Sequence, residues 1–132
     1  RIVDSHVHIA LPEHTKGIDI GLLKNDWALQ CATYMGEEQL HMYSKQLFPT
    51  ATFEYIALPM PFKGVDLVAN NQYLSNLRTR SLMATLPDWD IEYCENILLT
   101  GGFFGFKPYP NLVSTVKGAD IPIFDFMTYN SD

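Results

Sequence analysis

The sequence predicts an α/β fold with about four parallel strands, in a single domain that spans residues 1–132. Strand-like and helix-like segments alternate along the chain, and this order predicts parallel strands joined by right-handed crossovers. Hydrophobic residues make up 47% of the chain and charged residues 18%, which is enough apolar material for a buried core. Four such strands suit either an open α/β sheet or half of a (β/α)8 barrel.

The predicted strands are runs of alternating, β-branched or aromatic residues. Proline ends the second and third runs, at Pro59 and Pro87, and Pro108 follows the fourth. The four strands are predicted over residues 1–9, 50–58, 81–86 and 103–107.

Helices are predicted between the strands, where apolar residues recur with a spacing close to 3.6. The first helical stretch covers residues 19–47, with a break at Gly36. Asp66 and Asp88 are expected to cap the next two helices, and Gly101 is expected to end the last.

Several polar residues in these connections are interpreted as solvated. They are His14 in a predicted loop over residues 10–17, His41 on a helix flank, and the adjacent weak helix formers Asn70 and Asn71. The alternatives are a substrate contact for His14 and an internally hydrogen-bonded side chain for His41.

The composition excludes several classes of protein. The formal net charge is -6 and the basic residues are scattered, so no nucleic-acid partner is expected. No apolar run reaches the roughly 18 residues of a membrane span, and no signal peptide is recognised. Cys31 and Cys94 have no metal-binding or redox spacing. They are interpreted as buried thiols in a reducing compartment, which predicts a cytoplasmic protein.

The first strand carries the clearest chemical signal. Side chains two residues apart on a strand share a face, so Asp4, His6 and His8 are expected on one face. Val3 and Val7 are expected to pack on the other. Imidazole is a common metal ligand, and two on one rigid strand can bind the same ion. The alternative is a structural strand that carries two histidines without a metal.

The first strand also resembles a known signature. Residues 4–8, Asp-Ser-His-Val-His, are similar to the DxHxH motif on the first strand of the amidohydrolase superfamily. Residues 58–61 (Leu-Pro-Met-Pro) and 102–108 (Gly-Phe-Phe-Gly-Phe-Lys-Pro) resemble its amidohydrolase-2 branch. The resemblance extends in order to about Pro110. It implies a TIM barrel, which typically needs about 250 residues. The 132-residue chain is therefore expected to form the N-terminal half of such a barrel, an incomplete domain.

The resemblance implies a metal-dependent hydrolase that activates metal-bound water against a small carbonyl-containing or carboxylated substrate, with decarboxylation as a related reaction. It assigns His6 and His8 as ligands of a divalent metal, with zinc expected. The family's later histidine and aspartate ligands have no matching positions, since no histidine follows His41. This chain alone is therefore expected to be inactive.

Two further residues have candidate roles. Asp4 is expected to support a ligand from the second shell, or to make a purely structural hydrogen bond. Lys107, at the end of the fourth predicted strand, is expected to pair with a substrate carboxylate. Its alternatives are a carboxylated lysine that bridges two metals, as in some relatives, and a surface lysine.

Two other functions remain open from the sequence. One is a non-catalytic α/β fragment or assembly module without metal, and the other is a TatD-like or PHP-type phosphoesterase, which also opens with HxH. An isolated half barrel exposes a strand edge. Either a second copy of the chain is expected to cover this edge, as a homo-oligomer, or the chain is a fragment of a larger polypeptide.

Overall fold

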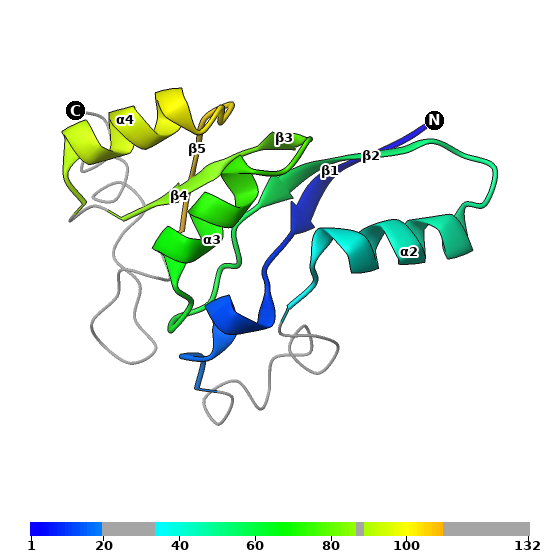
Figure 1. Ribbon diagram of the computed structural model, residues 1–132, viewed down its shortest axis with the longest axis horizontal. Helices are drawn as coiled ribbons and strands as arrows, with labels where there is room; N and C mark the ends of the chain where they lie inside the picture. The colour runs from blue at the N-terminus through cyan, green and yellow to red at the C-terminus, as the bar shows by residue number, and fades with distance from the viewer. Residues whose placement is uncertain (20–33, 87–88, 110–132) are drawn as a thin grey trace.

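The computed structural model of the protein describes residues 1–19, 34–86 and 89–109 (Figure 1). In chain order its elements are β1 (Ile2–His8), the 3-10 helix η1 (Pro12–Thr15), α2 (Glu37–Leu47), β2 (Phe53–Leu58), α3 (Leu67–Ser75), β3 (Arg80–Ser81), β4 (Met83–Thr85), α4 (Ile91–Thr100) and β5 (Phe106–Pro108). These strands pair in parallel, which confirms the predicted α/β class. Within the described ranges no helix has the length and apolar character that crossing a membrane requires.

The strands pair in chain order, as β1-β2-β3 in one sheet and β4-β5 in a second sheet. The predicted third strand over residues 81–86 is thus divided between β3, in the first sheet, and β4, in the second. Two backbone hydrogen bonds link them: Leu82 N–H donates to Ala57 O, and Phe104 N–H donates to Ser81 O, each at 3.0 Å. The stretch from β3 to β4 therefore lies between β2 and the segment that leads into β5.

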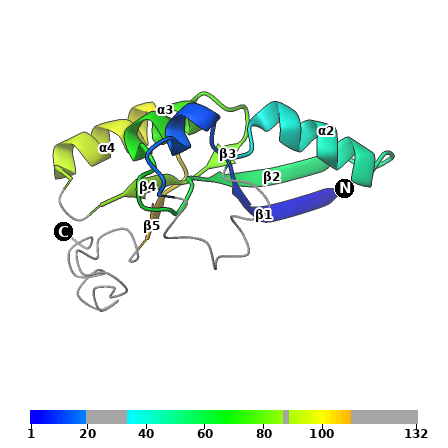
Figure 2. The same cartoon turned by 90° about the horizontal axis from the view of Figure 1, so that it is seen from below.

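The helices α2, α3 and α4 lie on one side of the strands (Figure 2). A doubly wound sheet would carry helices on both faces, whereas a (β/α)8 barrel carries them only on its outside. Among the described residues, the arrangement is therefore singly wound.

Side-chain caps set the start of two helices. Asp66 Oδ1 accepts a hydrogen bond from Ala69 N–H (2.9 Å) at α3, as predicted. At α4 the cap is Asp90, which accepts from Tyr93 N–H (2.9 Å), so the prediction of Asp88 was wrong. Both aspartates precede the same apolar run, and the cap is the one directly before the first helical residue.

The first predicted helical stretch is confirmed only in part. The helix α2 begins directly after Gly36, where the break was predicted, and His41 is exposed on it. Residues 20–33, including Cys31, lie outside the described residues, whereas Cys94 is buried as predicted.

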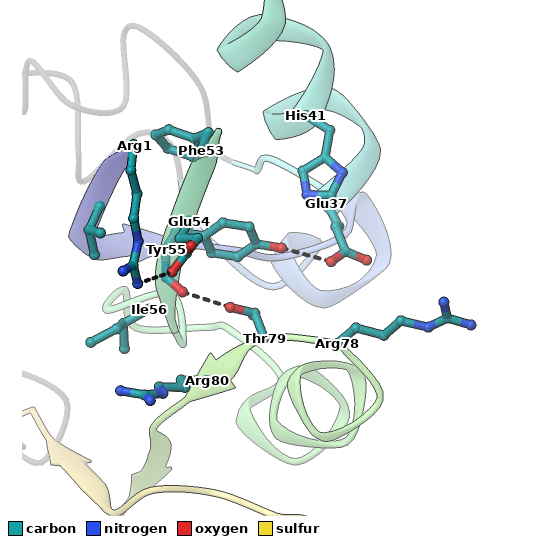
Figure 3. Close-up of a pocket in the computed structure, with 11 residues that line it drawn as sticks. Arg1, Glu37, His41, Phe53, Glu54, Tyr55, Ile56, Arg78, Thr79 and Arg80 are labelled. Carbon is teal, nitrogen blue, oxygen red and sulfur yellow. Dashed lines mark hydrogen bonds and ion pairs between the residues drawn. The ribbon is translucent and has the colours of Figure 1, made fainter. Parts of the chain in front are cut away.

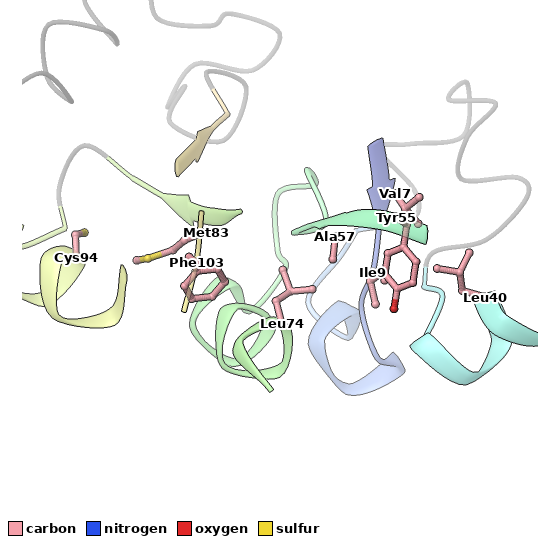
Figure 4. Close-up of a cluster of buried hydrophobic side chains, with 9 residues drawn as sticks. All are labelled: Val7, Ile9, Leu40, Tyr55, Ala57, Leu74, Met83, Cys94 and Phe103. Carbon is pink, nitrogen blue, oxygen red and sulfur yellow. The ribbon is translucent and has the colours of Figure 1, made fainter. Parts of the chain in front are cut away.

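The core lies between the strands and the helices. Its buried side chains form a continuous row from Leu40 on α2 to Cys94 on α4 (Figure 4). Between these ends lie Val7, Ile9, Tyr55, Ala57, Leu74, Met83 and Phe103. This cluster holds α2, α3 and α4 to the face of the strands that carries Val7.

The two adjacent asparagines on α3 are buried rather than solvated, which corrects the sequence interpretation. Asn70 is 0% exposed and Asn71 is 1% exposed. The Asn71 amide donates to Ala84 O and accepts from Ala84 N–H, both at 2.9 Å. Poor helix formers are tolerated here because their amides satisfy backbone groups that the strands leave unpaired.

His14 is also buried, contrary to the prediction of a solvated loop. Residues 12–15 form η1, and the His14 side chain is 6% exposed. Its Nδ1 accepts a hydrogen bond from Leu11 N–H (3.1 Å), so the proton of the neutral ring lies on Nε2. Burial lowers the pKa of His14, while Glu13 and Asp66 oppose this effect.

The buried His14 makes stability depend on pH. The unfolded chain takes up the imidazole proton near pH 6.5, and the folded chain takes it up only at lower pH. The free energy of unfolding is therefore expected to fall as the pH decreases from about 6.5 towards the folded pKa. His14→Asn, which keeps an acceptor for Leu11 N–H, should reduce this fall in urea titrations between pH 7 and pH 5. Identical pH slopes in the variant and the wild type would contradict the assignment.

Candidate metal centre

The two histidines of β1 face each other at the carboxyl end of the strand. Their Nε2 atoms are 3.1 Å apart, and their rings meet edge to face at a centroid distance of 4.9 Å. His6 is exposed and His8 is half-buried. The predicted pair therefore converges on one point that solvent can reach.

A backbone carbonyl holds His8 in place. The Nδ1 atom of His8 lies 2.6 Å from the Pro59 carbonyl oxygen, directly after β2. A carbonyl can only accept, so Nδ1 carries the proton and the Nε2 lone pair of the neutral ring points towards His6. Metal-binding histidines are commonly fixed by this kind of hydrogen bond on the second ring nitrogen.

The separation of the two Nε2 atoms matches a shared metal. Two Zn–N bonds of ordinary length at a tetrahedral angle place their nitrogens about 3.3 Å apart, close to the observed 3.1 Å. The same separation allows His6 to donate an N–H to His8 when no cation is present. The separation is therefore compatible with a zinc ion bound by both histidines and equally with a hydrogen bond between them.

The environment favours the neutral form of His8. Burial lowers the pKa of His8, and the neighbouring His6 and Lys107 lower it further, while the Pro59 carbonyl has the opposite effect. A neutral imidazole is the form that binds a metal. His8 is thus prepared to act as a ligand near neutral pH.

Lys107 lies on β5, close enough to His8 to lower its pKa. Its Nζ lies 5.4 Å from the centre of the Tyr109 ring, which is 6.2 Å from the centre of the His8 ring. The buried Tyr109 hydroxyl donates to the Pro59 carbonyl (2.9 Å), and burial raises the pKa of Tyr109. A positive charge and a phenol thus lie beside the histidine pair.

Asp4 does not share the histidine face, which corrects the prediction. In the pairing with β2, Asp4 is aligned with Tyr55 and Val7 with Ala57, so β1 contains one extra residue between them. This register shift places Asp4 and Val7 on one face and His8 on the other. Asp4 Oδ1 accepts from His6 N–H (3.0 Å), so Asp4 supports the backbone of a candidate ligand rather than its ring.

The same shift explains Val3. It was expected to pack with Val7, yet it is 57% exposed. Val3 precedes the register shift and His8 follows it. The shift therefore places both side chains on the same face of β1, away from the helices.

Among the described residues, no group of three or more His, Cys, Asp or Glu side chains is placed to hold a metal. Catalytic zinc sites usually have three protein ligands and one open position. His6 and His8 alone are fewer than the three protein ligands that such a site usually has.

A groove of about 430 Å³ lies at the opposite, amino ends of the strands (Figure 3). Arg1 and Glu54 form an ion pair across it at 2.6 Å, and both side chains are substantially exposed. The Tyr55 hydroxyl donates to Glu37 Oε1 (2.7 Å) at its wall. Because the histidine pair lies at the carboxyl ends, this groove is separate from the candidate metal centre.

Sequence reasoning missed the group that fixes His8, the Pro59 carbonyl. No sequence pattern identifies a backbone carbonyl as the acceptor for a particular side chain. The Leu58-Pro59 pair indicated only where the second strand ends. The buried Asn70 was also missed, and its signal was a pair of adjacent weak helix formers inside a predicted helix.

Comparison of the chain with protein-family models, curated proteins and solved structures finds no match.

Proposed function

We propose that the chain forms the first half of a metal-dependent hydrolase of the amidohydrolase superfamily, amidohydrolase-2 type, in which His6 and His8 hold a divalent zinc ion. The observation that carries this proposal is the 3.1 Å separation of the two Nε2 atoms, with His8 fixed on the Pro59 carbonyl. The remaining ligands are assigned to later strands of a complete barrel, as the resemblance implies.

The arrangement of the strands supports the barrel. Parallel strands that pair in chain order, with α2, α3 and α4 on one side, match the winding of a (β/α)8 barrel. The histidine pair lies at the carboxyl ends of the strands, where such barrels place their active sites. Among the described strands β1 lies at an edge of its sheet, which further strands of a complete barrel or a second copy of the chain would cover.

The residues beside the pair support a carboxylated substrate. When bound, the metal supplies a Lewis acid that polarises a carbonyl and lowers the pKa of a water ligand. Lys107 binds the substrate carboxylate as a point charge from β5, where the Tyr109 ring holds its ammonium group. Hydrolysis and decarboxylation both use such a carboxylate anchor, and the proposal covers both.

Metal binding by the purified chain tests the proposal. Isothermal titration with Zn²⁺ at pH 7 is expected to show one ion per chain. Its affinity should be lower than that of sites with three protein ligands, because only two are present. If the purified chain binds none of Zn²⁺, Co²⁺ and Mn²⁺ in a stoichiometric amount, the proposal is contradicted and the non-catalytic module without metal is favoured.

A further inference from the structure

Asn70 spans the carboxyl ends of β1 and β2 with a single side chain. Its Nδ2 donates to the Ile9 carbonyl (2.9 Å), and its Oδ1 accepts from Met60 N–H (2.9 Å). The side chain is 0% exposed, so water does not compete for these groups. An amide is suited to this position because it donates and accepts at once.

The two backbone groups held by Asn70 flank the hydrogen bond that fixes His8. Ile9 directly follows His8, and Met60 directly follows Pro59, whose carbonyl lies 2.6 Å from His8 Nδ1. The direct bond from Ile9 N–H to Leu58 O (3.0 Å) joins the strands just before this point. Asn70 therefore sets the spacing of the two backbone segments that continue beyond the last hydrogen bond between β1 and β2.

We propose that Asn70 is a positioning residue of the metal centre. By joining Ile9 to Met60, it holds His8 at hydrogen-bonding distance from the Pro59 carbonyl, and so directs the His8 Nε2 lone pair towards His6. This inference rests on the proposed function. It extends that function to a residue on α3 whose amide bonds backbone groups next to His8 and Pro59.

The neighbouring Asn71 provides a matched control. It has the same residue type, helix and burial, and its amide makes the same two kinds of hydrogen bond, but to Ala84 on β4. A loss of buried amide bonding alone should therefore affect both asparagines alike. Asn70 differs in that its two bonds join separate segments, the ones that flank the hydrogen bond between His8 and Pro59.

Asn70→Ala and Asn71→Ala are compared by zinc affinity, measured in competition with a chromogenic chelator. Removal of groups that orient a ligand commonly lowers metal affinity 10–100-fold. We expect a loss of at least about 10-fold for Asn70→Ala and less than about 3-fold for Asn71→Ala. Equal losses in the two variants, or none in either, would overturn the inference.

A second measurement does not depend on zinc. In proton NMR of the metal-free chain, the His8 Nδ1–H resonance should be visible and protected by the Pro59 carbonyl. It should disappear by fast exchange in Asn70→Ala and persist in Asn71→Ala. A protected resonance in both variants would overturn the inference, even if the wild-type chain bound no zinc and the proposed function failed.

Asn70→Asp covers the case in which Asn70→Ala does not fold. The aspartate has nearly the same volume and keeps an acceptor for Met60 N–H, but it replaces the donor to Ile9 with an oxygen and places a carboxylate at a buried position. Its zinc affinity and His8 resonance are expected to change in the same direction as in Asn70→Ala. Wild-type behaviour in both measurements would overturn the inference.

Discussion

Replacing His8 by alanine is expected to lower the affinity of the chain for zinc by at least about 100-fold, because even the loss of a group that merely orients a ligand costs 10–100-fold. The substitution removes the one candidate ligand whose second nitrogen is fixed, at 2.6 Å from the Pro59 carbonyl. The measurement is competition with a chromogenic chelator at pH 7, with circular dichroism to verify the fold.

His6 and His41 complete this experiment. His6→Ala should cause a comparable loss of affinity, since the two Nε2 atoms lie 3.1 Å apart and would bind the same ion. His41→Ala is the matched control, because His41 is an exposed histidine on α2. Equal zinc affinity in the His8, His6 and His41 variants would contradict the assignment of the pair.

Replacing Gly64 by alanine is expected to lower the free energy of unfolding by more than about 3 kcal/mol. Gly64 has a φ of 90°, which side-chain-bearing residues rarely adopt. A Cβ on Gly64 would overlap the carbonyl oxygen of Gly17 and lie 2.5 Å from its carbonyl carbon. The clash is with backbone of the loop that follows η1, so no side-chain movement can relieve it. Urea unfolding followed by circular dichroism measures the loss.

Gly102 separates backbone strain from the clash. It also has a positive φ, 67°, but a Cβ there would meet no atom within 4 Å. Gly102→Ala should therefore lower the free energy of unfolding by only about 1–2 kcal/mol. Equal effects of the two substitutions would show that the contact between Gly17 and Gly64 is not needed for the fold.

The local patterns of the chain predicted much of the fold. The strands were predicted over residues 1–9 and 50–58, and the structure has β1 at Ile2–His8 and β2 at Phe53–Leu58. Proline and glycine located several element ends, at Pro59 after β2, Gly36 before α2 and Gly101 after α4, since both residues restrict or free the backbone locally. The fourth strand was predicted over residues 103–107, and β5 runs from Phe106 to Pro108.

Several errors concern polar side chains that the rest of the fold buries. His14, Asn70 and Asn71 have polar side chains that local patterns assign to solvent, and each is buried with hydrogen-bond partners. Asp4 was placed on the histidine face by strict alternation, and the register shift in β1 reversed this. A one-residue shift of register exchanges the faces of every residue beyond it.

The alternation of strands and helices and the His-Val-His spacing can be read from the sequence, because both depend on side chains two to four positions apart. The shape of the candidate metal centre depends on the tertiary structure. His8 meets the Pro59 carbonyl across 51 positions, and Asn70 meets Ile9 across 61. Such contacts form only when β1, β2 and α3 pack in one register. Residue spacing therefore identified the two candidate ligands, and packing decided which groups hold them in place.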